Sequence, residues 1–291
     1  MKLVRYRHNG TNSWGVLEDG LVAPMAGAWA TMPEALAEGG ESIARAMHAV
    51  TARIAVSDLV LLKPVEQGVR IFCIGLNYAG HVAETAREAP QFPSVFLRTH
   101  ESLVGPGDTI VLPLASSRFD FEAELAVVIG VGGRRIRMED ADKHIAGYTC
   151  MGEHSVRDFQ RHNAQVTPGK NFDGSGAIGP WITTADAVPD PASLQVLGRL
   201  NGNSVQQGHI GDLIYPIARL IAYISEFTSL RPGDVIATGT PAGVGATRVP
   251  PLFMTEGDRF EVEIPGVGSL VNLVVPERSL PSDEATQPRA A

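Results

Sequence analysis

The sequence predicts an α+β protein in which strands outnumber helices. Most of its apolar runs are short, rich in β-branched residues and bounded by glycine or proline, which is typical of strands. Few segments have helical periodicity, and the clearest is 214–228. The pattern changes near residue 65, which predicts a small N-terminal α/β unit over 1–65 and a larger, mainly β unit over 66–280.

The N-terminal unit begins with a predicted hairpin over 1–20, because apolar and polar residues alternate around an Asn-Gly turn signal. A helix is expected to follow, with Thr31 as its N-cap and Pro33 in its first turn. We expect it to continue, with a break at the glycine pair 39–40, towards Ile54.

The larger unit alternates strand signals with short helical ones. Strands are expected at 71–74, 94–97, 109–112, 119–129, 147–151, 181–184, 193–200, 235–238 and 259–264. Helices are expected at 81–88, 155–161 and 214–228. The polar tail, 281–291, is predicted to be disordered.

Composition excludes several classes of function. No apolar run approaches the length of about 20 residues that spans a bilayer, so we expect no membrane role. A net charge of -8 argues against a nucleic-acid partner, which would favour clustered lysine and arginine. The N-terminus has no secretory pattern, and Cys73 and Cys150 lie among apolar residues as buried thiols do, so a cytoplasmic location is expected.

The segment "FDFEAEL", 119–125, raises the question of a metal site. In a strand, period-two alternation places Asp120, Glu122 and Glu124 on one face. The Cα atoms of Glu122 and Glu124 are then about 7 Å apart, so their carboxylates can converge on one cation. Carboxylates alone favour Mg²⁺ or Mn²⁺ rather than zinc.

A second segment warns against relying on spacing. "DRFEVEIPG" places Glu261 and Glu263 on one strand face by the same rule, and either pair is also typical of a solvated face. One difference separates them. Strand 119–129 continues into the apolar run "LAVVIG", as expected of a strand buried on both faces, and a buried carboxylate needs a partner.

Seven motifs extend this pattern over residues 71–272, and together they resemble the fumarylacetoacetate hydrolase family. The motifs are "IGLNYAGHVAE", "FLRTHESLVGPGD", "FDFEAELAVVIG", "GYTCMGEHSVRDFQ", "GKNFDGSGAIGPW", "LRPGDVIATGTPAGVG" and "GDRFEVEIPGVGSLVN". The branch indicated contains acylpyruvate hydrolases and 2-hydroxyhepta-2,4-diene-1,7-dioate isomerases. The resemblance implies a mixed β-sandwich roll of the family's C-terminal type, and a homodimer.

The resemblance also implies one Mg²⁺ or Mn²⁺ bound by three carboxylates. Two of them would be Glu122 and Glu124. The third usually comes from an Asn-Asp pair after "GYT", and here that pair reads Gly152-Glu153, which makes Glu153 the expected ligand. The histidine that follows also departs from the commonest pattern. Asp158 is the fallback ligand, although its position suits a structural acid on a helix.

A catalytic pair is implied by the same resemblance. His81 and Glu84 are three residues apart and share a helix face, so the carboxylate can orient the imidazole while it activates water. Taken without the family, the pair is equally typical of a solvated surface.

Four further residues match substrate contacts of the family. Lys170, the third expected catalytic residue, and Gln160 would reach the substrate, where either could stabilise an oxyanion. Arg98 stands where many members have lysine and could bind a carboxylate bidentately, and Thr240 would hold the substrate carboxylate with neighbouring amides. Lys170, Gln160 and Arg98 also have an unremarkable alternative, because such residues are commonly solvated on the surface.

The function implied is metal-dependent hydrolysis of a 2,4-dioxo acid, an acylpyruvate such as fumarylpyruvate, to pyruvate and a carboxylic acid in aromatic or related catabolism. Decarboxylation of oxaloacetate-like 2-oxo acids, isomerisation of 2-hydroxymuconate-type dienes and cleavage of diketo sugar acids are alternatives on the same site. A catalytically silent binding subunit is a further alternative, because the motif departs from the family pattern at 152–154.

Overall fold

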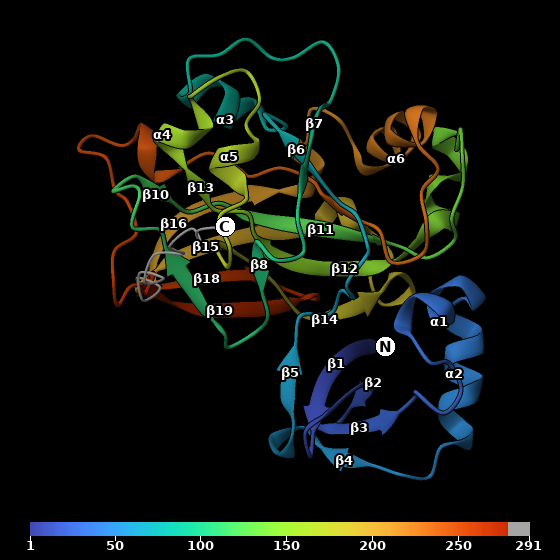
Figure 1. The fold of residues 1–291 in the computed structure, drawn as a ribbon. Helices are drawn as coiled ribbons and strands as arrows, with labels where there is room; N and C mark the ends of the chain where they lie inside the picture. The colour runs from blue at the N-terminus through green and yellow to red at the C-terminus, as the bar shows by residue number, and fades with distance from the viewer. Residues whose placement is uncertain (279–291) are drawn as a thin grey trace, which may run out of the picture.

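The computed structural model describes residues 1–278, so the predicted disordered tail, 281–291, lies outside the described residues. The α+β class with strands in excess is confirmed. A small N-terminal unit of strands and two helices lies beside a larger unit built on two sheets (Figure 1).

The N-terminal unit contains the predicted hairpin. Strands β1 (Lys2–His8) and β2 (Thr11–Glu18) pair antiparallel, and the turn residues Asn9 and Gly10 have positive φ angles of 49° and 79°. Two short strands, β3 (Leu21–Pro24) and β4 (Ile54–Ala55), extend this sheet and were not predicted.

The helical prediction in this unit is correct at its start and wrong at its end. Thr31 caps α1 (Met32–Glu38) through a capping box with Glu34, and a positive φ at Gly39 separates α1 from α2 (Gly40–Ala49). The helix does not continue towards Ile54, because that residue pairs in β4.

One sheet of twelve strands runs through both units. Its main order is β4-β3-β2-β1-β14-β12-β11-β17-β6-β7, with β5 on β1 and β8 on β14. The pairing of β1 with β14 joins the N-terminal unit to the larger one. The other strands are β5 (Val60–Leu62), β6 (Ile71–Gly75), β7 (Ser94–Arg98), β8 (Leu103–Val104), β11 (Ala123–Ile129), β12 (Ile145–Gly152), β14 (Gly176–Thr184) and β17 (Val235–Ala237).

A second sheet of five strands packs against the first, and the main core lies between them. Its order is β16-β15-β18-β19-β9, and β16 and β19 were not predicted. A two-stranded sheet pairs β10 with β13. The bounds are β9 (Thr109–Leu112), β10 (Phe119–Asp120), β13 (Ser155–Val156), β15 (Gln195–Leu200), β16 (Asn203–His209), β18 (Arg259–Ile264) and β19 (Gly268–Pro276).

Strand β11 is buried on both faces, as its apolar run predicts. Leu125 and Val127 belong to the core between the two sheets, whereas Ala126 and Val128 belong to a second core that includes residues of α1 and α2. The predicted single strand 119–129 is wrong in one respect. It is interrupted after β10, which pairs with β13 instead of β12.

The helices of the larger unit are shorter than the sequence predicts. α3 (Ala79–Glu84) ends where Ala86 takes a positive φ of 52°, and the segment predicted as helix 155–161 begins as β13 before α4 (Arg157–Gln160). α5 (Thr167–Lys170) was not predicted, and α6 (Ile217–Phe227) was. None of the helices within residues 1–278 is both long and apolar enough to cross a membrane.

Gly147 tests the close approach of two central strands. A Cβ at this position of β12 would lie 2.2 Å from the carbonyl oxygen of Thr183 in β14. Gly147→Ala should therefore lower the free energy of unfolding by about 2 to 3 kcal/mol in urea titrations, because the strands must separate. Gly27→Ala is the matched control, since its Cβ meets nothing within 4 Å. Equal stability of the two variants would contradict this packing.

Candidate active site

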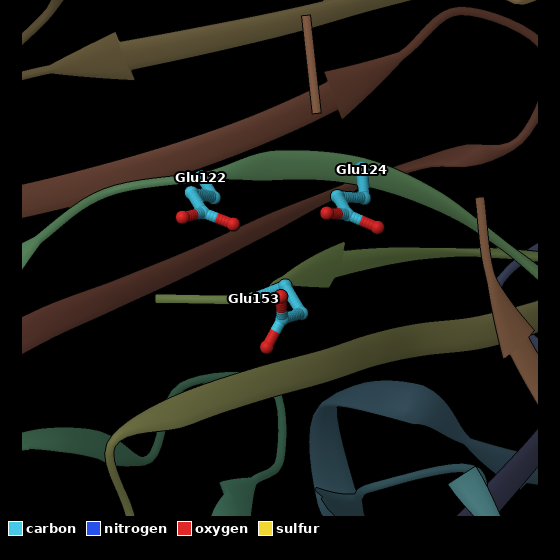
Figure 2. A group of neighbouring side chains, drawn as sticks. All are labelled: Glu122, Glu124 and Glu153. Atoms are coloured by element: carbon cyan, nitrogen blue, oxygen red, sulfur yellow. The ribbon is translucent and has the colours of Figure 1, made fainter. Parts of the chain in front are cut away.

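Three buried glutamates form a cluster at the start of β11 and the end of β12. One oxygen from each of Glu122, Glu124 and Glu153 lies within 4.8 Å of the others (Figure 2). The register of the two strands brings them together, because Ala123 pairs with Gly152 and the Glu153 amide donates to the Glu122 carbonyl at 2.9 Å. The structure thus brings together the three predicted ligands.

Cations surround two of the three carboxylates. Glu122 accepts from Lys170 Nζ at 2.9 Å and lies 2.8 Å from Arg157 Nη1. Glu153 accepts from Arg98 Nη1 at 2.7 Å and also from Lys170 Nζ. Lys170 therefore bridges two carboxylates of the cluster.

Glu124 has no such partner. Its carboxylate accepts from the Gly239 amide at 2.8 Å, and within residues 1–278 no cation forms an ion pair with it. A fourth buried acid, Asp120, accepts from Arg157 Nε at 2.7 Å and from the amides of Gly245 and Ala246. Four buried carboxyl groups thus face three buried cations, and Glu124 is the one without a cationic partner.

The pKa values follow this arrangement. Burial acts to raise the pKa of Glu122, but Lys170 and Arg157 outweigh it and hold that pKa well below its usual range. Burial, followed by the charges of Glu153 and Glu122, raises the pKa of Glu124 well above its usual value. Burial also raises the pKa of Glu153, although Lys170 and Arg98 oppose it.

A divalent cation fits this cluster. The donors are all carboxylate oxygens, which suit Mg²⁺ and Mn²⁺, and Glu124 is a buried carboxylate that a cation would compensate. Glu122, Glu124 and Glu153 would hold the ion.

A histidine-glutamate pair forms another part of the site. His81 Nδ1 lies 2.7 Å from Glu84 Oε1, and Glu84 Oε2 accepts from the Gly243 amide at 2.8 Å and Thr247 Oγ1 at 3.0 Å. Burial acts to raise the pKa of Glu84, but the hydrogen bonds from His81 and Gly243 outweigh it and lower that pKa. Because Glu84 accepts at Nδ1, the other ring nitrogen, Nε2, is left to face a ligand.

One cavity of about 270 Å³ joins these parts. The pair His81 and Glu84 and all three clustered glutamates line it. Pockets for drug-sized ligands are larger, about 300 to 1,000 Å³, so this cavity suits a small ligand. The cavity is also lined by polar and charged residues, among them Arg87, Arg157, Gln160, Arg161, Lys170 and Thr240.

Gln160 and Thr240, two of the predicted substrate-binding residues, line the cavity, and each has a side-chain oxygen that is hydrogen-bonded to another protein group. Gln160 Oε1 accepts from Arg157 Nη1 at 3.0 Å. Thr240 Oγ1 donates to the Ala123 carbonyl at 3.0 Å and accepts from Gln206 at 2.8 Å.

Arg98, a predicted substrate-binding residue, lies among protein acceptors and not on the cavity wall. Its buried guanidinium donates to Glu153, the His154 carbonyl, Ser102 and Ser175, and it does not line the cavity. Arg98 therefore holds a carboxylate of the protein rather than one of a ligand.

The other acidic residues considered as candidates do not belong to the cluster. The fallback ligand Asp158 accepts from Ser116 Oγ at 2.7 Å and lies outside the cluster. The comparison pair Glu261 and Glu263 forms partly exposed ion pairs with Arg199, so it is a surface feature.

The sequence analysis missed Arg157. Besides Asp120, its guanidinium contacts Glu122 and Gln160, while Nη2 is buried and has no hydrogen-bond partner among residues 1–278. The available signal was its position three residues before Gln160, because residues i and i+3 share a helix face.

Gly152 and His154, which depart from the family pattern expected at 152–154, are complementary in size. A Cβ at Gly152 would lie 2.7 Å from His154 Nε2, so the buried histidine ring occupies the space of a side chain at 152. The ring packs edge-on against Phe119 and Phe260. Burial, aided by the charge of Arg98, lowers the His154 pKa to about 3, so the ring is neutral.

The fold and the site define an α+β protein with a carboxylate-lined cavity beside a histidine-glutamate pair. Residues 70–275 match the family described as fumarylacetoacetate (FAA) hydrolase, C-terminal, and residues 1–59 match the family described as Rv2993c-like, N-terminal. The chain therefore belongs to the fumarylacetoacetate hydrolase family. The resemblance drawn from its motifs, and the roll that it implies, are confirmed.

The relatives of this chain are named after different reactions. Human oxaloacetate tautomerase FAHD2A, mitochondrial, is 40% identical over 250 residues, which span 84% of this chain and 80% of that protein. The structure of maleylpyruvate hydrolase from Sphingobium sp. SYK-6 with manganese(II) and pyruvate is 30% identical, with a TM-score of 0.80 and coverage of 96% and 100%. The 2-hydroxyhepta-2,4-diene-1,7-dioate isomerase from Mycobacterium marinum is 28% identical, with a TM-score of 0.77 and the same coverage.

These relatives fix the family but not one reaction, because they include a tautomerase, a hydrolase and an isomerase. The manganese ion in the Sphingobium structure agrees with the metal class predicted from the carboxylates. The homodimer stays a prediction. So does the cytoplasmic location, since the human relative is named as mitochondrial.

Glu124 tests the metal site with two opposite effects. Glu124→Gln should weaken Mg²⁺ and Mn²⁺ binding at least a hundredfold in calorimetric titrations, because a direct ligand is lost. It should also stabilise the metal-free protein by about 1 kcal/mol near neutral pH, because burial raises the Glu124 pKa in the folded state and so disfavours folding, whereas glutamine does not ionise. Glu263→Gln, at the partly exposed Arg199 pair, is the control. Unchanged metal affinity in Glu124→Gln would refute the ligand assignment.

The pair at 152 and 154 can be tested by a double-mutant cycle. Gly152→Ala alone should destabilise the protein by about 2 kcal/mol, because the added methyl displaces the buried ring. With His154→Ala, that space is free, so the two losses in unfolding free energy should be less than additive by at least about 1 kcal/mol. Additive losses would show that the two positions are independent.

Proposed function

We propose that this chain is a divalent-metal-dependent enzyme that moves a proton at C3 of a 2-oxo acid and so interconverts the keto and enol forms of an oxaloacetate-like dicarboxylic acid. The observation that carries the proposal is the single cavity that places the His81–Glu84 pair and the three-carboxylate cluster on its walls. The 40% identity to an oxaloacetate tautomerase over most of both chains supports this reaction.

The inner end of the cavity would hold the acid by its 1-carboxylate and 2-oxo oxygens. A bound Mg²⁺ or Mn²⁺ would act as a Lewis acid that stabilises negative charge on the 2-oxo oxygen. Arg157 and Lys170 are the buried cations that line this cavity, and their positive charges would stabilise negative charge on the substrate.

His81 would be the acid and base of the reaction. Its Nε2 takes a proton from C3 of the keto form, the C–H electron pair becomes the C2–C3 double bond, and the carbonyl oxygen gains the negative charge. Return of this proton from His81 to that oxygen, directly or through water, completes the enol and restores the neutral ring, and the reverse sequence returns the keto form. Glu84 keeps the ring oriented and stabilises its protonated state, since it remains a carboxylate held by three donors.

Acylpyruvate hydrolysis is the second candidate, and the same pair of residues favours it. A water molecule, rather than C3, would give its proton to His81, and hydroxide would attack the C4 carbonyl. The C3–C4 bond would then break to yield pyruvate and a carboxylic acid. The structural likeness to a maleylpyruvate hydrolase solved with pyruvate supports this reading, at lower identity than the tautomerase.

The acid-base role can be tested on oxaloacetate with Mg²⁺ or Mn²⁺, by following decay of the enol absorbance and, by NMR, exchange of C3 protons with D₂O. His81→Gln should lower kcat by about 10² to 10⁴-fold, because the proton carrier is lost. The exposed His48→Gln is the control. Full activity of His81→Gln would overturn the assignment. Pyruvate release from maleylpyruvate or fumarylpyruvate, faster than enol decay on oxaloacetate, would favour the hydrolase.

A further inference from the structure

Helix α3 leads from the catalytic pair to an exposed arginine. His81 is buried, Glu84 is half-buried and Arg87 is exposed, and all three line the cavity. The backbone of Arg87 is fixed to the helix end, because its amide bonds to the Val82 carbonyl while Ala86, in left-handed conformation, bonds back to Ala83. The arginine is thus held at a defined place relative to the pair.

Helix α4 and the residue after it show the same order of burial along the cavity. Arg157 is buried, Gln160 is half-buried and Arg161 is exposed, and these three residues also line the cavity. Their spacing of i, i+3 and i+4 puts them on one helix face. Both helices therefore run from the buried inner end of the cavity to its exposed mouth, and α3 and α4 are neighbours in Figure 1.

The two mouth arginines have no acidic partner within residues 1–278. The inner groups have acidic partners, since Arg157 pairs with Asp120, Lys170 pairs with Glu122 and His81 is hydrogen-bonded to Glu84. Arg87 and Arg161 form no ion pair of this kind, and their hydrogen bonds are those of their backbone amides. In a chain with a net charge of -8, two unpaired cations at one cavity mouth favour an anionic ligand group there.

We propose that Arg87 and Arg161 determine specificity by binding the distal carboxylate of a 2-oxo dicarboxylic acid, an inference that rests on the proposed function for the placement of the 1-carboxylate and 2-oxo group. With that end at the buried carboxylates, the far end of a small acid points to the mouth. Guanidinium groups bind carboxylates in a planar, bidentate manner. A monocarboxylic 2-oxo acid leaves both arginines without an anion.

The test compares oxaloacetate with 2-oxobutanoate, which have four carbons each and differ in the distal carboxylate. Affinities are measured by calorimetry with Mg²⁺ in a His81→Gln background, so that turnover does not interfere. Arg87→Gln and Arg161→Gln should each lower the ratio of diacid to monoacid affinity between about threefold and tenfold, mainly through the diacid. Arg118→Gln is the matched control, since this exposed arginine does not line the cavity.

The outcomes separate this inference from the proposed reaction. If wild-type protein turns over oxaloacetate but neither variant changes the affinity ratio, the assignment of the two arginines is wrong and the proposed function stands. If wild-type protein shows no turnover but prefers the diacid, and the variants reduce that preference, the arginines read the distal carboxylate and the reaction is wrong. Equal loss of affinity for both acids would also refute the specificity role, whereas Arg161→Lys should retain part of the preference because it keeps the charge.

Discussion

Four buried carboxylates packed against three buried cations are the constraint on which the site depends. Each cation comes from a different element, with Arg98 on β7, Arg157 on α4 and Lys170 on α5. Their acids lie in or beside the strands β10, β11 and β12. Removing one partner of a buried ion pair costs about 3 to 5 kcal/mol, so these pairs fix the short elements around the cavity to the central sheet. Glu124, which has no cationic partner, is the acid that gives the cluster its capacity for a cation.

The residues at 152–154 show how a departure from the family pattern is accommodated. Glutamate at 153 reaches one methylene further than aspartate would, and Arg98 holds its carboxylate with a buried guanidinium. Glycine at 152 leaves space that the His154 ring fills. The three-carboxylate geometry is therefore retained by a set of linked substitutions, which weakens the alternative of a silent homologue, because a decayed site has no reason to keep a buried, uncompensated acid.

Alternation and turn chemistry predicted much of the fold. The hairpin at Asn9, the cap at Thr31 and the doubly buried strand β11 follow from local rules, and the cluster of Glu122 and Glu124 follows from that strand. The sequence could not show that the strand 119–129 is interrupted, since β10 leaves the ladder to pair with β13, which is a tertiary effect. Nor could it assign Arg98 and Arg157, because both are charged residues whose burial depends on acids far away in the sequence.

The carboxylate cluster cannot by itself select the reaction, because any 2-oxo acid chelated there presents the same carbonyl. Selection must come from groups that face the rest of the substrate, and α3 and α4 supply them. In the proposed mechanism, a substrate C–H bond at Nε2 of His81 would lead to tautomerisation, whereas a water molecule there would lead to hydrolysis. A distal carboxylate bound at the mouth by Arg87 and Arg161 would fix where C3 lies relative to that nitrogen, so specificity for the acid and choice of reaction would be set by the same two helices.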